Sequence, residues 1–229
     1  MKKNYIIAGA SSSMAKTLAV QLKEQGHTVI GISTKTEVEG YDEVYTIPNY
    51  HESTYPELEI PINGLIYFPG SINLKPFARL SSEDFINDFN INALGAVKFI
   101  QAYLKNMKLA GNSSVVFVSS VAATCGMPYH SSIAMAKAAV EGLTISLAAE
   151  LAPSVRVNAV APSLTNTTLS EKFLNTPDKT EAAQKRNPLK QIGKPEDISN
   201  AIEFLISDKS GWVSGQIISV DGGMNNLKL

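Results

Sequence analysis

Short apolar runs of strand length alternate along this chain with longer segments whose apolar residues repeat at helical spacing. Residues 5–8, Tyr-Ile-Ile-Ala, end at Gly9, which is typical of a buried strand. Residues 14–25 have the period of a helix and end at Gly26, a residue common just after a helix C-terminus. The same reasoning predicts strands at 28–32, 44–47, 65–68, 115–118, 155–160 and 216–220, helices at 132–151 and 196–206, and a long helix from the capping sequence at 81–84 through Ile100.

The order of these elements predicts an α/β fold. Strands that are apolar throughout are buried on both sides, and helices that join such strands cover the two faces of a parallel sheet. Because no linker, repeat or low-complexity segment interrupts residues 1–229, we expect one domain with a single doubly wound sheet. The crossover at 48–64 holds three prolines and is too short for a full packing helix. Polar residues 163–191 follow a strand end, where ligands bind in such sheets, and are expected to form a mobile lid.

Composition excludes several classes of function. The chain has 20 Lys plus Arg and 21 Asp plus Glu, and a net charge of -1 provides no positive surface for nucleic acid. Cys125 is its one cysteine, so no disulfide can form within the chain and a reducing compartment is expected. The N-terminal apolar run is too short for a signal peptide, and no stretch approaches the roughly 20 apolar residues that span a bilayer. We therefore expect a cytoplasmic protein that binds neither nucleic acid nor membrane.

The turn after the first predicted strand is the first candidate for chemistry. Residues 9–15 read Gly-Ala-Ser-Ser-Ser-Met-Ala, and such small residues let backbone N–H groups at a helix N-terminus approach a pyrophosphate. The same sequence also fits ordinary packing between a strand and a helix. Its place after the first strand favours a dinucleotide site, and no spacing of His, Cys or acidic residues suggests a metal. The expected cofactor contacts here are Gly9, Ser11, Ser12, Ser13 and Met14.

Further motifs follow one another along the chain. They are Asn92-x-x-Gly95, Ser120 at a strand end, Lys-Ala-Ala-Val-Glu-Gly-Leu-Thr from Lys137, Arg-Val-Asn-Ala-Val-Ala-Pro up to Pro162, Gly-Lys-Pro-Glu-Asp-Ile at 193–198 and Asp-Gly-Gly at 221–223. In this order and spacing they resemble the short-chain dehydrogenase/reductase family over essentially the whole chain, nearest in general pattern to 3-oxoacyl-acyl-carrier-protein reductases. The resemblance implies a Rossmann-like fold and hydride transfer between a nicotinamide cofactor and a carbonyl.

The resemblance also implies roles for three retained residues. Ser120 corresponds to the serine that hydrogen-bonds the developing oxyanion, and Lys137 to the lysine that holds the ribose hydroxyls. Asn92 corresponds to the asparagine that anchors a water of the proton relay. The family's catalytic tyrosine lies four residues before the lysine, where this chain has Ile133, which has no proton to donate.

Two residues could replace the missing tyrosine. Tyr129 and His130 lie eight and seven residues before Lys137, and both are candidate catalytic residues. The enoyl reductases of the family keep an aliphatic residue four before the lysine and their tyrosine seven before it, so Tyr129 misses that register by one. The alternative is that Tyr129 and His130 are loop residues at the rim of the site.

The end of the second predicted strand bears on the choice of cofactor. An NAD enzyme usually places an aspartate there, but this chain has Ser33 followed by Thr34 and Lys35. A lysine beside two hydroxyls suits a 2′-phosphate, so NADP is favoured over NAD; the alternative is a solvated lysine on a turn. By resemblance, the remaining cofactor contacts are Gly70, Pro162 and Thr167, the last beside the nicotinamide carboxamide.

Together these features predict an oxidoreductase that transfers a hydride between NADP(H) and a small-molecule carbonyl or enoyl substrate, with activity reduced or altered by Ile133. The alternative is a non-catalytic dinucleotide-binding sensor or scaffold on the same fold. The retained serine and asparagine argue against it, because a pure binding protein needs only the lysine of the three. The family usually assembles through two long helices, and the apolar residues at 94–103 and 139–147 exceed the needs of one core, so a homotetramer, or else a dimer, is expected.

Overall fold

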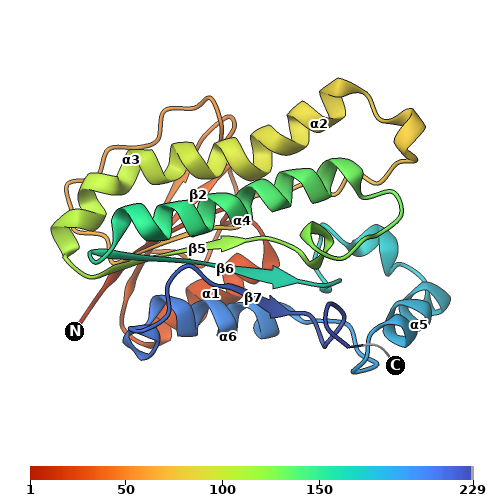
Figure 1. Cartoon of the computed structure of the whole chain (residues 1–229). Helices are drawn as coiled ribbons and strands as arrows, with labels where there is room; N and C mark the ends of the chain where they lie inside the picture. Colours follow the sequence, from red (N-terminus) through yellow and green to blue (C-terminus); the bar gives the residue numbers. More distant parts are fainter. Residues whose placement is uncertain (228–229) are drawn as a thin grey trace.

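Seven parallel strands form one sheet in the computed structural model, which describes residues 1–227 (Figure 1). The strand order is β3-β2-β1-β4-β5-β6-β7, so the chain builds outward from β1 in one direction and then from β4 in the other. This order confirms the predicted α/β class with a doubly wound, Rossmann-like sheet. The strands are β1 (Asn4–Ala8), β2 (Thr28–Ser33), β3 (Glu43–Thr46), β4 (Gly64–Tyr67), β5 (Ser113–Val118), β6 (Val155–Pro162) and β7 (Ile217–Val220).

Helices cover both faces of the sheet, as Figure 1 shows. One layer consists of α2 (Ser82–Phe89), α3 (Gly95–Ala110) and α4 (Ser131–Leu151). The opposite layer consists of α1 (Ser13–Glu24) and α6 (Pro195–Ile206), which pack against each other. α5 (Pro177–Arg186) lies beyond the C-terminal ends of the strands. Short helical turns are η1 (Phe77–Arg79), η3 (Val121–Ala123), η4 (Glu171–Phe173) and η5 (Asp208–Ser210).

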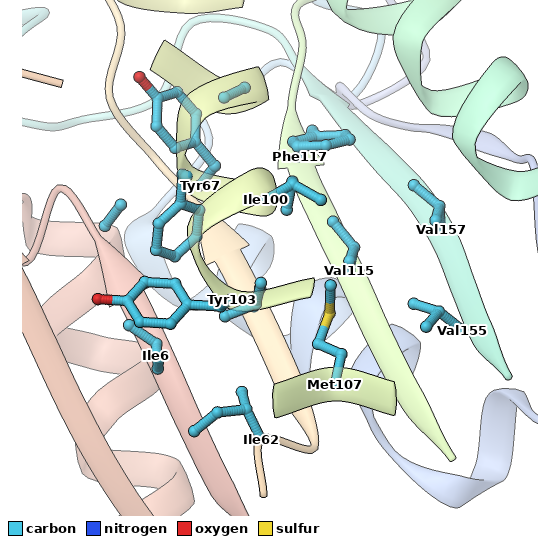
Figure 2. Packing of buried hydrophobic residues seen from close by; sticks show 14 of the residues in the cluster. Ile6, Ile62, Tyr67, Ile100, Tyr103, Met107, Val115, Phe117, Val155 and Val157 are labelled. Atoms are coloured by element: carbon cyan, nitrogen blue, oxygen red, sulfur yellow. The ribbon is translucent and has the colours of Figure 1, made fainter. Parts of the chain in front are cut away.

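A hydrophobic core on each face holds the layers together. On the α3 side, Phe99 packs against the rings of Tyr67 and Tyr103, with centroids 5.8 and 5.6 Å away. Figure 2 shows Ile100 of α3 beside Val115 and its neighbours on β5. Each such burial contributes about 1.5–3 kcal/mol, and this layer keeps the strand ends that carry the site in a fixed position.

This packing corrects one expectation about the surface of α3. Phe99, Ile100 and Tyr103 were expected to exceed the needs of the core, but they are buried in it. The spacing of apolar residues along a helix does not show how much of the helix surface the sheet will bury. The large apolar residues exposed on the helices of this layer are others: Ile86 and Phe89 on α2, Leu109 at the end of α3, and Met135 and Ile145 on α4.

The long helix predicted from residue 81 is interrupted by a π turn. Ser81 and Asp84 form the expected capping box of α2, but Asn90–Leu94 then adopts a π-helical turn before α3 begins. The Tyr67 hydroxyl donates a hydrogen bond to the Ile91 carbonyl in this turn at 2.6 Å. A Cβ on Gly95 would lie 2.1 Å from that hydroxyl, so the close approach requires glycine. π turns are frequent at functional sites, and this one carries Asn92.

Other differences from the expected elements are small. Most boundaries shift by one or two residues, and residues 47–63 contain no helix, as the short crossover predicted. The segment 163–191 is less irregular than expected, because it contains η4 and α5.

α4 departs from the expectation that no stretch approaches membrane-spanning length. It has 21 residues, and an 18-residue stretch within it has a mean hydropathy of 1.3, so it is long and apolar enough to cross a membrane by length and composition alone. α4 nevertheless packs against β6 and α2 and carries the buried Lys137.

Candidate functional site

The parallel sheet brings the predicted site residues to one edge. Gly9 follows β1, Ser33 ends β2, Gly70 follows β4, Ser120 follows β5 and Pro162 ends β6. The C-terminal ends of parallel strands face the same way, so these five positions surround one crevice, which is where open α/β sheets bind ligands.

The turn between β1 and α1 has the shape expected of a phosphate-binding turn. Gly9 has φ +78°, and a Cβ there would lie 3.0 Å from the Cβ of Phe68. Ser12 caps α1, since its Oγ accepts a hydrogen bond from the Ala15 N–H at 3.2 Å. The Oγ of Ser13 is buried without a hydrogen-bond partner in the part of the chain that the structure describes. Ser11 and Met14 are half-buried beside it, so the start of α1 offers several donors to an anion.

Lys137 lies at the centre of the crevice. Its Nζ donates a hydrogen bond to the Val118 carbonyl at the end of β5, at 2.6 Å, and its side chain is buried. Burial lowers the pKa of Lys137 to about 8, and the negative charge of Asp88 acts in the opposite direction. The lysine is therefore poised to exchange a proton near neutral pH.

Asn92 and Lys137 face the same small space beside Gly70. The Asn92 Nδ2 donates hydrogen bonds to the Asp88 carbonyl at 2.8 Å and to the Ser71 hydroxyl at 3.0 Å. Its Oδ1 is buried and has no partner within residues 1–227. A Cβ on Gly70 would lie 3.1 Å from that Oδ1 and 3.3 Å from the Lys137 Nζ. The absence of a side chain at Gly70 thus allows its backbone to lie close to one acceptor and one cation.

Ser120 and Ile133 complete the surroundings of Lys137. Ser120 is half-buried, and its Oγ accepts a hydrogen bond from the Ala122 N–H at 3.2 Å, which leaves its own proton free to donate. Ile133 lies one turn before Lys137 on α4 and is 4% exposed. The position of the family's tyrosine is therefore filled by a buried aliphatic side chain.

Tyr129 and His130 immediately precede the first residue of α4, and His130 is its N-cap. Tyr129 has φ +70° and its side chain is 58% exposed. Its carbonyl accepts a hydrogen bond from the Lys75 N–H, and the His130 Nδ1 pairs with the Pro128 carbonyl at 2.7 Å. No hydrogen bond in the described part of the chain joins either ring to Ser120 or Lys137. Their catalytic role stays a prediction.

The end of β2 carries the residues predicted to choose the cofactor. Ser33 is buried, and its Oγ accepts a hydrogen bond from the Lys35 N–H at 2.9 Å, which shapes the turn. Thr34 and Lys35 are exposed on this turn. Tyr50, which the motif analysis missed, lies beside them: burial raises its pKa, while hydrogen bonds with Thr34 and the backbone of Gly9 lower it.

The start of the predicted lid, residues 163–191, forms a turn held by local hydrogen bonds after Pro162. The Thr167 N–H donates a hydrogen bond to Ser170 at 3.0 Å, and the Ser170 hydroxyl donates to the Thr165 carbonyl at 2.5 Å. A cavity of about 430 Å³ lies between the lid and the start of α6, lined by residues that include Asn166 and Gly193. None of the predicted catalytic residues lines this cavity, so it is separate from the space beside Gly70.

The structure adds Asp88, Ser71 and Ser132 to the site. Asp88 is 2% exposed, and its carboxylate accepts hydrogen bonds from Ser71 at 2.5 Å and from Ser132. A sequence signal was available, because Asp88 lies four residues before Asn92 and therefore on the same side of a helix. No motif marks Ser71 or Ser132, which lie on other segments.

Comparisons with known proteins agree with this geometry. The family model described as "Enoyl-(Acyl carrier protein) reductase" matches residues 34–225. The 3-oxoacyl-acyl-carrier-protein reductase of Thermotoga maritima is 32% identical, over 96% of this chain and 96% of that protein. The chain belongs to the short-chain dehydrogenase/reductase family.

Solved structures of dehydrogenases have the same architecture. The ligand-free aldohexose dehydrogenase of Thermoplasma acidophilum has a TM-score of 0.89 at 24% identity, over 99% of this chain and 95% of that one. A protein of Agrobacterium tumefaciens described as a 2-deoxy-D-gluconate 3-dehydrogenase, with bound NADP, has a TM-score of 0.88 at 25% identity, over 97% and 96% of the two chains. The doubly wound sheet of this chain is thus the fold of the short-chain dehydrogenases/reductases.

The residues of the crevice fit a dinucleotide. Five buried side-chain polar atoms have no hydrogen-bond partner among residues 1–227, and two of them, the Ser13 Oγ and the Asn92 Oδ1, belong to the predicted site. Gly9 and Gly70 lie where any side chain would press on its neighbours, so their backbones are close to the residues of the site. Buried polar atoms are ordinarily hydrogen-bonded, so two such atoms at one edge of the sheet indicate a polar ligand there.

Proposed function

We propose that this member of the short-chain dehydrogenase/reductase family is an NADP(H)-dependent oxidoreductase of a small-molecule carbonyl or enoyl compound. The observation that carries the proposal is that the Lys137 Nζ and the partnerless Asn92 Oδ1 both lie next to Gly70. A lysine and an asparagine at these places are what the family uses beside its nicotinamide. A low or altered activity is expected, because Ile133 provides no proton.

Each residue of the crevice then has a defined task. The turn at 9–14 binds the pyrophosphate through backbone N–H groups, and Lys137 donates to the ribose hydroxyls. Ser120 has a free proton for the substrate oxygen, on which negative charge develops. Pro162, which ends β6, and Thr167, which follows that strand, are proposed to contact the nicotinamide end. The cofactor, when bound, supplies or accepts the hydride.

The closing experiment for this function is a cofactor screen. NADPH and NADH binding is measured by calorimetry, and oxidation of each is then followed across a set of ketone and enoyl substrates. Binding of NADPH together with turnover of either substrate class supports the proposal. If neither nucleotide binds at 1 mM, the proposed function is wrong.

Replacing Lys35 with aspartate is expected to lower the ratio of NADPH affinity to NADH affinity by about tenfold. The change reverses the charge near the 2′-phosphate, and an exposed charge pair is worth well under 2 kcal/mol in water, so a larger effect is not expected. Calorimetry with both nucleotides gives the ratio. Lys209→Asp is the matched control, since Lys209 is also exposed but lies at the opposite edge of the sheet. Its neighbour Asp208 forms an ion pair with Lys3, which precedes the N-terminal end of β1. Equal affinities in the parent would contradict the NADP assignment.

A non-catalytic dinucleotide-binding sensor or scaffold is the second candidate. The observation that favours it is the buried aliphatic side chain of Ile133 at the tyrosine position. The sensor is distinguished from the enzyme by NADPH binding without turnover of any carbonyl or enoyl substrate. We propose a cytoplasmic location in either case, and neither nucleic acid nor membrane is proposed as a partner.

A homotetramer, or else a homodimer, is the proposed assembly. Ile86 and Phe89 on α2 and Met135 and Ile145 on α4 are large, exposed and on the same side of the sheet. Apolar surface of this kind is favourably buried between copies. Multi-angle light scattering at micromolar concentration is expected to give two or four times the chain mass, and Ile145→Lys is expected to shift the population toward the monomer. A monomeric parent would overturn this assignment.

A further inference from the structure

A buried carboxylate lies behind the lysine and asparagine of the site. Asp88 on α2 is 2% exposed. Its Oδ1 accepts a hydrogen bond from the Ser71 hydroxyl at 2.5 Å, and its Oδ2 accepts one from the Ser132 hydroxyl. Three segments that are distant in sequence thus meet at one side chain: the loop after β4, α2 and the start of α4. A buried charge is costly unless it is hydrogen-bonded, and both oxygens of this one are.

This carboxylate is connected to the Asn92 side chain in two ways. Ser71, which donates its proton to Asp88, accepts a hydrogen bond from the Asn92 Nδ2 at 3.0 Å. The same Nδ2 donates to the Asp88 carbonyl at 2.8 Å. Because the amide nitrogen is committed to these two acceptors, the Oδ1 points toward Gly70. The orientation of the Asn92 carboxamide therefore depends on the Asp88 segment.

Asp88 also provides a negative charge that acts on Lys137, which has no ionisable tyrosine beside it in this chain. In the family's arrangement the lysine lies beside a tyrosine that can ionise, but Ile133 cannot carry charge. A buried ammonium without an opposite charge tends to lose its proton. Ser132, the residue that immediately precedes Ile133, is the one that orients the Asp88 carboxylate from α4.

Other charged groups on the elements around Lys137 point elsewhere. α2 also carries Glu83 and Asp84, and Asp84 pairs with Lys75 at 2.6 Å. Glu141 on α4 accepts a hydrogen bond from Ser119 at 2.7 Å. The remaining neighbours of α4 are β5, β6, η3 and the π turn; of these only β6 carries a charge, Arg156, which donates to the Leu205 carbonyl. Among all of them, Asp88 is the group that opposes the effect of burial on the Lys137 pKa.

We infer that Asp88 is a positioning residue of the cofactor site: held by Ser71 and Ser132, it orients the Asn92 carboxamide toward Gly70 and Lys137 and holds a negative charge on that side of α2. Asp88 touches no reacting atom in this role. The role of Asp88 in binding the cofactor rests on the proposed function. The effect of Asp88 on the pKa of Lys137 can be measured without any cofactor.

The first test measures Lys137 without any nucleotide. The protein is labelled with ¹³C-lysine, the Lys137 signal is assigned by its loss in Lys137→Arg, and its pKa is determined by NMR titration. The parent is expected to give about 8. Asp88→Asn, which removes the charge but keeps the shape, is expected to lower the value by about one pH unit. Glu83→Gln is the matched control, since it removes one exposed negative charge from the same helix and is expected to leave the value unchanged.

The second test measures the binding of NADPH by fluorescence between pH 6.5 and 9.5. The cationic lysine is the form that donates to ribose hydroxyls, so affinity is expected to fall as the pH rises through about 8. The midpoint of this fall should move to lower pH in Asp88→Asn and should disappear from the range in Lys137→Arg.

The two tests separate the inference from the proposed function. A parent that binds no NADPH contradicts the proposed function, and the NMR titration still decides the role of Asp88. An unchanged Lys137 pKa in a folded Asp88→Asn protein overturns the inference. If that variant does not fold, Asp88→Ser leaves room for a water between Ser71 and Ser132 and replaces it. Failure of both variants to fold makes Asp88 a purely structural residue and likewise overturns the inference.

Discussion

Ile133→Tyr is expected to raise the turnover of a simple ketone with NADPH by at least about tenfold. The substitution places a phenol one helical turn before Lys137, on the same side of α4. General acid catalysis is typically worth about 10²–10⁴-fold, and Ser120, Asn92 and Lys137 are already in the crevice. The gain should fall short of the full factor, because the site is packed around an aliphatic side chain that is 4% exposed. Initial rates of NADPH oxidation at saturating ketone give the change in kcat.

Ile133→Phe is the matched control, since it introduces the same ring without a proton to donate. It is expected to leave the turnover at or below that of the parent. A different result would identify another proton donor. If Tyr129→Phe or His130→Ala abolishes activity while Ile133→Tyr changes little, Tyr129 or His130 is the general acid. If all of these variants bind NADPH and none changes turnover, the sensor function is the better account.

Gly70→Val is expected to weaken NADPH binding by at least about tenfold. The first added carbon would lie 3.1 Å from the Asn92 Oδ1 and 3.3 Å from the Lys137 Nζ, and the two methyl groups would extend further into the same space. Overpacking of this kind costs about 1–3 kcal/mol, and here the strain falls on the two groups that face the ligand. Calorimetric titration with NADPH measures the loss, and thermal unfolding reports whether the fold is intact.

Gly126→Val provides the matched control for that variant. Gly126 lies in the loop between β5 and α4, and a Cβ there has no neighbour within 4 Å. Its substitution is expected to leave NADPH affinity within about twofold of the parent, as is usual for surface changes. A Gly70→Val protein that is folded and binds NADPH like the parent would show that the space beside Gly70 is not part of the nucleotide site.

Several features of the site follow from local sequence. The apolar runs and helical repeats place β1, β5 and α4 within about two residues of their observed limits, because such patterns depend only on neighbours along the chain. The turn at Gly9 follows in the same way, since a tight turn with positive φ favours glycine. The positions of Asn92 and Lys137 were accessible because the motifs that contain them occur in a known order.

Contacts between segments were decided only by the tertiary structure. Ser71 and Ser132 lie 17 and 44 residues from Asp88 in sequence. The Ser132 hydroxyl meets the carboxylate because α2 and α4 pack side by side, and the Ser71 hydroxyl meets it because the loop after β4 passes beside α2. The π turn around Asn92 likewise depends on the Tyr67 hydroxyl, which reaches it from β4. Sequence by itself thus determined the order of strands and helices and the residues at the edge of the sheet, through short-range periodicity and backbone preference. The surroundings of the lysine depend on how helices pack across a sheet, and no local pattern encodes that packing.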